Sequence, residues 1–245
     1  MINFTDEQVV AYLDQLALYC HEYSLSADRK QLELCLKHLD YVLEANKTTN
    51  LTRILNVDDA LVLHVLDSLV LLPYVNEAPE GALLDMGTGA GFPGIPLTIC
   101  SHRPATYIDS VGKKINAVNS FIQDLNLKHA QGVHGRLEDY ARSHKKSFAV
   151  VTARALAPLP TLIEYAAPFI KDNGLFVITK GNPSNEELSA GDSAAKICGF
   201  VCQKEASLDL PKGLGHREFI VLRKTRPSSV SLPRANGMAK KNPLA

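Results

Sequence analysis

From residue 81 onward, short apolar runs alternate with stretches whose apolar residues recur at helical spacing. The apolar runs predict seven strands, at residues 82–86, 106–109, 130–134, 148–153, 175–179, 200–208 and 218–222. The helical stretches are residues 113–125, 162–170 and 186–198. This alternation predicts an α/β fold, in which a mainly parallel sheet carries helices on both faces. The last two strands have no helix between them, which favours an antiparallel edge.

The first 80 residues show only helical periodicity. Thr5 begins the first predicted helix, and a second one has leucines along one face. Asp58 or Asp59 caps a third helix, which Pro73 ends. The predicted units are a helical extension at residues 1–80, an α/β domain at residues 81–223 and a C-terminal tail at residues 224–245.

The third predicted helix carries three polar residues that can share one face, His64, Asp67 and Ser68. A hydrolytic triad is one interpretation. Residues on a single helix rarely meet the geometry of a triad, and no strand-to-helix turn frames the serine. We therefore favour a polar network that anchors the helical extension to the rest of the chain.

A glycine-rich segment follows the first predicted strand, with Gly87, Gly89 and Gly91 in alternation. A strand, a glycine loop and a helix N-terminus form the nucleotide site of a doubly wound sheet. The dinucleotide fingerprint G-x-G-x-x-G fits poorly, because Phe92 takes its last position. Asp85 precedes the loop and suits a cationic ligand such as S-adenosylmethionine, whose methyltransferases carry the motif D-x-G-x-G-x-G. The alternative is a turn that serves packing alone.

Ligands of such sheets bind beyond the carboxyl ends of the strands. Asp109 ends the second predicted strand, where an acid can accept hydrogen bonds from ribose hydroxyls; a turn or cap aspartate is the alternative. Leu137 and Glu138 follow the third strand, where they can contact adenine. Arg154 ends the fourth strand and faces the expected reaction cleft.

Charge is distributed unevenly along a chain whose net charge is zero. No acid follows Glu218, whereas six lysines and arginines do. A basic tail on an acidic body suggests an anionic partner, or else a solvated end. We expect this tail to be extended when free.

The five cysteines form no C-x-x-C pair, and the eight histidines show no metal-ligand spacing. We therefore expect reduced thiols and no metal. The chain shows no secretory signal and no long apolar span, so a cytoplasmic protein without membrane association is expected.

Several motifs, taken together, resemble the GidB family, the RsmG-type methyltransferases of small-subunit ribosomal RNA. The glycine segment from Asp85 to Leu97 carries most of the resemblance. The other matching pieces are Asn50-Leu51-Thr52, His64-Val65-Leu66-Asp67-Ser68-Leu69, Asp109-Ser110-Val111-Gly112-Lys113-Lys114, Arg154-Ala155 and Lys180-Gly181. They occur from about residue 46 to the C-terminus in the order and spacing of the family.

The resemblance implies a Rossmann-like enzyme that transfers a methyl group from S-adenosylmethionine to N7 of a guanine in 16S rRNA. With the positions derived above, the expected cofactor contacts are Asp85, Gly87, Gly89, Phe92, Asp109, Leu137, Glu138 and Arg154. Phe92 stands where many family members have leucine. No catalytic residue is assigned, because guanine N7 has a free lone pair and loses no proton when methylated.

The expected partner is small-subunit rRNA or the assembled small ribosomal subunit, with no obligate protein partner. The expected RNA contacts are Lys47, Arg53, Arg154, Lys180, Arg234, Lys240 and Lys241. Two alternatives stay open. One is a methyltransferase that acts on a protein or a small molecule, and the other is a non-catalytic ribosome-assembly factor.

Overall fold

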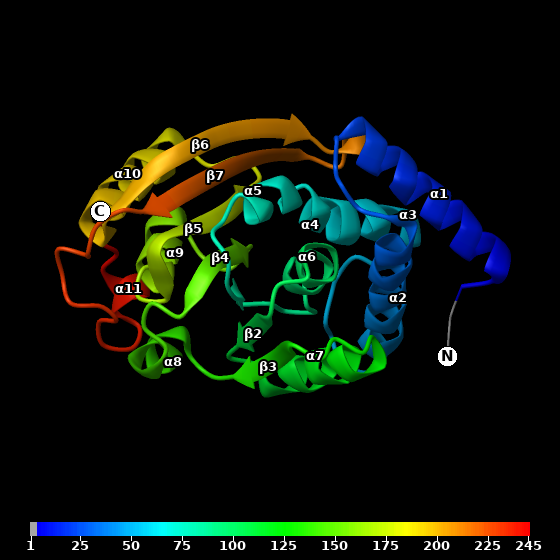
Figure 1. Cartoon of the computed structure of the whole chain (residues 1–245), viewed down its shortest axis with the longest axis horizontal. Coiled ribbons are helices and arrows are strands. Elements are labelled where there is room, and N and C mark those ends of the chain that lie inside the picture. The colour runs from blue at the N-terminus through cyan, green and yellow to red at the C-terminus, as the bar shows by residue number, and fades with distance from the viewer. Residues whose placement is uncertain (1–3) are drawn as a thin grey trace.

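A computed structural model describes residues 4–245 and contains one seven-stranded sheet (Figure 1). The strands are β1 (Leu83–Met86), β2 (Ala105–Asp109), β3 (Ala130–His134), β4 (Phe148–Arg154), β5 (Ile170–Lys180), β6 (Phe200–Asp209) and β7 (His216–Lys224). They lie in the order β3-β2-β1-β4-β5-β7-β6, and only the pairs that include β7 are antiparallel. The predicted α/β class and its antiparallel edge are confirmed.

Helices cover both faces of this sheet. They are α1 (Asp6–Glu22), α2 (Arg29–Asn46), α3 (Val57–Ala60), the π-helical η1 (Leu61–Leu66), α4 (Asp67–Leu69), α5 (Leu72–Asn76), α6 (Gly94–Ser101), α7 (Gly112–Asp124), α8 (Leu137–Ser143), α9 (Leu159–Ala166), α10 (Asn185–Cys198), the 3-10 turn η2 (Pro211–Gly213) and α11 (Met238–Lys241). Sequence periodicity did not predict α8 or α11, because both are short.

Alternate strand residues enter two separate cores. Leu83 and Val150 join the core formed with α1, α2, α6 and α7, whereas Leu84 and Val151 join the core formed with α9 and α10. This alternation follows from the two-residue period of a strand. The helical extension therefore packs on the α6 and α7 face of the sheet.

The third predicted helix has different boundaries in the structure. Asn56, rather than an aspartate, caps it, because the Asn56 side chain accepts a hydrogen bond from the Asp59 backbone N–H at 3.0 Å. The helix then widens into η1. Pro73 lies in the first turn of α5 and ends no helix, since N–H groups there need no helical partner.

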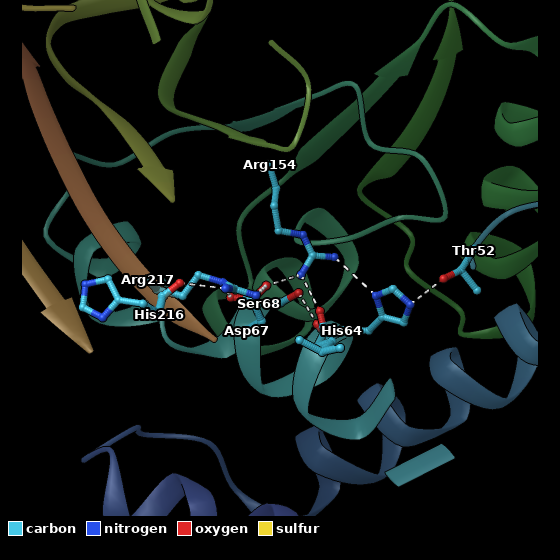
Figure 2. A network of polar contacts seen from close by, with 8 residues as sticks. Thr52, His64, Asp67, Ser68, Arg154, His216 and Arg217 are labelled. Atoms are coloured by element: carbon cyan, nitrogen blue, oxygen red, sulfur yellow. Dashed lines mark hydrogen bonds and ion pairs between the residues drawn. The ribbon is translucent and has the colours of Figure 1, made fainter. Parts of the chain in front are cut away.

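The polar residues of this helical region form an anchoring network and not a triad (Figure 2). The Ser68 hydroxyl donates to the backbone carbonyl of His64 at 2.5 Å. The Asp67 carboxylate accepts from Arg154 of β4 at 2.8 Å and from Arg217 of β7 at 2.7 Å. One buried carboxylate thus joins the helical extension to two strands of the sheet.

His64 extends the network toward the loop that follows α2. Its Nε2 lies 2.8 Å from the Thr52 hydroxyl, and its Nδ1 lies 3.5 Å from an Arg154 nitrogen (Figure 2). Burial, with a smaller effect of the Arg154 charge, lowers the pKa of His64 to about 3. Because a guanidinium only donates, we assign the imidazole proton to Nε2.

The C-terminal tail is not extended, contrary to our expectation. It folds back along α8 and α9 and ends in the short helix α11 (Figure 1). Leu232 and Ala239 are buried, and Arg234 pairs with the buried Glu164 of α9 at 2.6 Å. These contacts offset the conformational entropy that the segment loses when it becomes ordered. Its composition alone suggests a solvated tail.

Asp67→Asn tests the anchoring network. The variant leaves two largely buried guanidinium groups without their carboxylate, so we expect the free energy of unfolding to fall by about 3 kcal/mol. Urea denaturation measures this change. Asp58→Asn is the control, because Asp58 pairs with Lys212 only at the surface, and a shift within about 0.5 kcal/mol is expected. Equal effects of the two substitutions would contradict the anchoring role of Asp67.

Candidate active site

A cavity of about 280 Å³ opens beyond the carboxyl ends of β1, β2 and β3. Its lining residues are Gly87, Ile108, Asp109, Ser110, Gly135, Arg136, Leu137, Glu138, Leu156, Tyr165, Gly237 and Lys240. The strand order reverses between β1 and β4, and the segments that follow these two strands contribute Gly87 and Leu156 to the cavity. Doubly wound sheets bind their ligands at such a switch point. The volume is near the lower end of the range for small-molecule sites, roughly 300–1,000 Å³.

The glycine loop contributes its first residue, Gly87, to the lining of the cavity. Gly87 has a φ of +67°, and a Cβ built there would lie 2.5 Å from the Leu156 side chain. The Gly87 backbone N–H donates to the Ile108 carbonyl at 2.8 Å, so the loop is tied to the end of β2. Glycine is therefore required here both by the backbone conformation and by the close approach of Leu156.

Asp109 connects the glycine loop to the start of α7. Its carboxylate accepts a hydrogen bond from the Gly89 N–H at 3.1 Å and another from the Val111 N–H at 2.9 Å. The side chain also lines the cavity, and its oxygens keep further lone pairs for a ligand hydroxyl. This arrangement supports the predicted contact between Asp109 and ribose, while Gly89 supports the cavity through Asp109 without lining it.

Asp85 does not face the cavity, which corrects its expected contact with a cationic ligand. It is fully buried, accepts from the Gly94 N–H at 3.1 Å, and accepts from the Thr152 hydroxyl at 3.1 Å. A carboxylate at the N-terminus of α6 is favoured by the helix dipole. Asp85 therefore holds α6 and β4 in place around the loop.

Phe92 and Arg154 also lie outside the lining of the cavity, in contrast to our expectation. The Phe92 ring packs between two histidines, with ring centroids 4.4 Å from His38 and 4.7 Å from His64. The Arg154 side chain is directed toward Asp67 (Figure 2). Both residues fix the position of the glycine loop and of the β4 exit relative to the helical extension.

The β4 exit turns sharply at Ala155, whose φ of +51° lies in the left-handed region. This conformation costs an alanine about 1 kcal/mol and places Arg154 and Leu156 in different environments. Arg154 enters the anchoring network, whereas Leu156 contacts the glycine loop and lines the cavity. Backbone strain is found in many active sites.

Leu137 and Glu138, the expected adenine contacts, line the cavity from the first turn of α8. Glu138 is buried, and its carboxylate accepts a hydrogen bond from the Gly237 N–H at 2.9 Å. Sequence reasoning missed several lining residues, namely Ser110, Leu156, Tyr165 and Gly237. Ser110 directly follows Asp109, and Leu156 lies two residues after Arg154, whereas Tyr165 and Gly237 carry no local signal.

The predicted RNA-binding residues fall into two groups. Three of them have their charges paired with carboxylates: Arg154 with Asp67, Lys180 with Glu187 and Arg234 with Glu164. The others are exposed, namely Lys47, Arg53, Lys240 and Lys241. Lys47 and Arg53 line one hollow together, and Lys47 also pairs with Glu44.

Across residues 4–245, no group of three or more histidine, cysteine, aspartate or glutamate side chains is arranged to hold a metal ion. In the same part of the chain, no helix combines the length and the apolar character that crossing a membrane requires.

Asp85→Asn tests the buried carboxylate through its pH dependence. Burial raises the pKa of Asp85 from 3.8 to about 6. The folded protein therefore binds a proton more tightly than the unfolded chain, and stability is lost as the pH rises from about 4 to about 6. We expect the wild type to lose about 3 kcal/mol relative to Asp85→Asn across this range, measured by urea denaturation.

Thr152→Val provides the companion measurement, since it removes a hydrogen bond that stabilises the Asp85 carboxylate. The pKa of Asp85 in the folded protein then rises further, so the loss of stability should start at the same pH as in the wild type but extend to higher pH. A parallel pH dependence of the wild type and Asp85→Asn would contradict a raised pKa of Asp85.

Solved structures with a similar fold include methyltransferases of low sequence identity. Geranyl diphosphate methyltransferase in complex with SAM matches with a TM-score of 0.54 at 13% identity, over 69% of this chain and 90% of that one. Precorrin-6y C5,15-methyltransferase from Geobacter metallireducens matches with a TM-score of 0.50 at 11% identity, over 64% of this chain and 87% of that one. These similarities establish the Rossmann-like fold of class I methyltransferases.

Sequence comparison is more specific. The chain is 37% identical to ribosomal RNA small subunit methyltransferase G of Desulfitobacterium hafniense, over 90% of this chain and 91% of the relative. It is 34% identical to the Bacillus velezensis protein of the same name, over 91% and 95% of the two chains. The model of the GidB family, rRNA small subunit methyltransferase G, matches residues 31–212. The predicted resemblance is confirmed, and the chain belongs to the GidB family.

Proposed function

We propose that this protein transfers a methyl group from S-adenosylmethionine to N7 of a guanine in 16S rRNA. The observation that carries the proposal is the cavity at the switch point of the sheet in a chain of the GidB family. Asp109 offers acceptors for ribose hydroxyls, and Ile108, Leu137 and Leu156 offer apolar surface for a purine ring. The cavity thus combines the groups that an adenosine-containing cofactor requires.

When bound, the cofactor supplies a methyl group on a sulfonium, which is already activated for transfer. Guanine N7 has an in-plane lone pair and releases no proton, so the protein has to align the two reactants and exclude water. His64 does not act as a general base in this proposal. Its lowered pKa keeps the ring neutral, and Thr52 and Arg154 occupy both ring nitrogens. The residues around the cavity therefore act by positioning.

RNA binding is proposed for the exposed basic residues outside the cavity lining, namely Lys47, Arg53 and Lys241. Arg53 lines a hollow with Asn46 and Asn50, whose amides can donate to phosphate or base atoms. A single guanidinium that contacts phosphate contributes affinity without sequence preference. The guanine itself has to be unpaired or splayed out, because N7 lies deep in the narrow major groove of A-form RNA.

The proposed partner is the rRNA itself or the assembled small subunit, without an obligate protein partner. Such a substrate places the protein in the cytoplasm. The remaining alternatives are a methyltransferase of protein or small molecules and a non-catalytic assembly factor. Both would leave the nucleosides of 16S rRNA unchanged.

The direct test combines purified protein, labelled S-adenosylmethionine and small ribosomal subunits from cells that lack this gene. Nuclease digestion and mass spectrometry should reveal 7-methylguanosine in one fragment of 16S rRNA. Asp109→Ala should reduce this product at least tenfold, because it loses a cofactor contact and the support of Gly89. Arg226→Ala is the control, a change at an exposed basic position outside the cavity lining.

Three other outcomes oppose the proposal in different ways. Label in protein or in small molecules would indicate another acceptor. Cofactor binding without transfer to any acceptor would favour an assembly factor. A failure of the wild type to bind the cofactor would contradict the assignment of the cavity.

Arg53→Ala tests the proposed RNA surface. We expect weaker binding to small-subunit rRNA and a salt dependence reduced by about one unit of slope in a plot of log K against log salt concentration. Filter binding at several salt concentrations measures both. An unchanged slope would exclude a phosphate contact by Arg53.

A further inference from the structure

The C-terminal segment from Leu232 to Asn242, which we call the strap, is fastened to the body of the protein (Figure 1). Arg234 donates to both carboxylate oxygens of Glu164, at 2.7 and 2.6 Å, and to the Asn242 carbonyl at 2.7 Å. The Thr161 hydroxyl donates to the Ala239 carbonyl at 3.1 Å in a buried position. These contacts fix the strap against α9 at both of its ends.

A second set of contacts fixes the strap to α8. The Asn236 amide donates to the two oxygens of Asp139 at 2.9 and 3.1 Å. The Gly237 N–H donates to Glu138 at 2.9 Å, and the φ of +81° at Gly237 makes this backbone direction available without strain. The strap therefore holds the first turn of α8, which carries Leu137 and Glu138.

The strap also reaches the cavity itself. Gly237 and Lys240 line it together with Leu137, Glu138 and Tyr165. Leu137 and Glu138 follow β3 at the start of α8, and the adenine half of the proposed cofactor is assigned to this part of the cavity. Lys241, the next residue, is also exposed but is absent from the lining of the cavity.

We propose that the strap completes the cofactor site and that the Lys240 ammonium donates to the adenosine half of the ligand. An ammonium group has only donors. The methionine half of S-adenosylmethionine carries two cations, its amino group and its sulfonium, besides its carboxylate, so the position of Lys240 beside Leu137 and Glu138 after β3 assigns it to the adenosine half. The ring nitrogens of adenine and the ribose oxygens are acceptors without charge. The inference rests on the proposed function, and it gives this part of the basic tail a cofactor role in place of the RNA role expected from its charge.

Matched single substitutions test the strap, with S-adenosylhomocysteine as the probe in isothermal titration calorimetry. Lys240→Ala should weaken binding about tenfold, the equivalent of one charge-assisted hydrogen bond. Lys241→Ala should leave the affinity unchanged, although both variants lose one positive charge. Adenosine as a second probe should show the same tenfold difference, because it contains the half of the ligand that Lys240 contacts.

Gly237→Ala tests the same inference through the backbone. An alanine at positive φ shifts the strap, so the affinity for S-adenosylhomocysteine should fall while circular dichroism and the thermal midpoint stay near those of the wild type. The space around Gly237 is open, with no atom within 4 Å of a built Cβ, so steric conflict does not explain a loss.

Equal affinities of the wild type, Lys240→Ala and Lys241→Ala for S-adenosylhomocysteine would overturn the inference. Equal losses of rRNA affinity in both lysine variants, with unchanged cofactor affinity, would assign the tail to RNA and also overturn it. Failure of the wild type to bind S-adenosylhomocysteine would contradict the proposed function itself. If the wild type methylates rRNA normally and Lys240→Ala binds S-adenosylhomocysteine as tightly as the wild type, only the proposed role of the strap is contradicted.

Discussion

The burial of one carboxylate between β1, β4 and α6 determines the geometry on which the cavity depends. Asp85 accepts hydrogen bonds from Gly94 at the start of α6 and from Thr152 near the end of β4. Gly94 has to be glycine, because a Cβ there would lie 2.7 Å from the Asp85 carboxylate and from the Tyr107 ring. The glycine loop runs between these fixed points, so its backbone is placed before any ligand arrives.

A second carboxylate, Asp67, has the same function on the other side of the loop. It draws together Arg154 and Arg217 from two strands (Figure 2). The adjoining His64 ring stacks on Phe92 of the loop. The helical extension is therefore part of the support of the site. Arg154 and Phe92, which the sequence suggests as ligand contacts, serve this support in the structure.

Most of the fold could be predicted from the sequence because strand and helix periodicities are local. The predicted strand at residues 130–134 has the bounds of β3, and Thr5 does cap the first helix. The cap at Asn56 could not be predicted. Asp58 and Asp59 lie within three residues of Asn56, and aspartate is as good an N-cap residue as asparagine.

The candidate site was predicted in part, for a physical reason. Gly87, Asp109, Leu137 and Glu138 line the cavity because strand ends converge at the same edge of a parallel sheet. Asp85 was assigned to the ligand because its position in the motif is visible, whereas its burial is not. The strap depends on contacts such as Arg234 with Glu164, seventy residues apart in the chain. Its charge alone suggested a free RNA-binding tail.

The measurement that tests this account most directly is a crystal structure of the protein with S-adenosylhomocysteine. The account predicts electron density in the cavity, with ribose at Asp109, adenine between Leu137 and Leu156, and Lys240 within hydrogen-bond distance of the adenosine half. Density in another hollow of the molecule, or a ligand in the cavity with the strap displaced from it, would contradict the account.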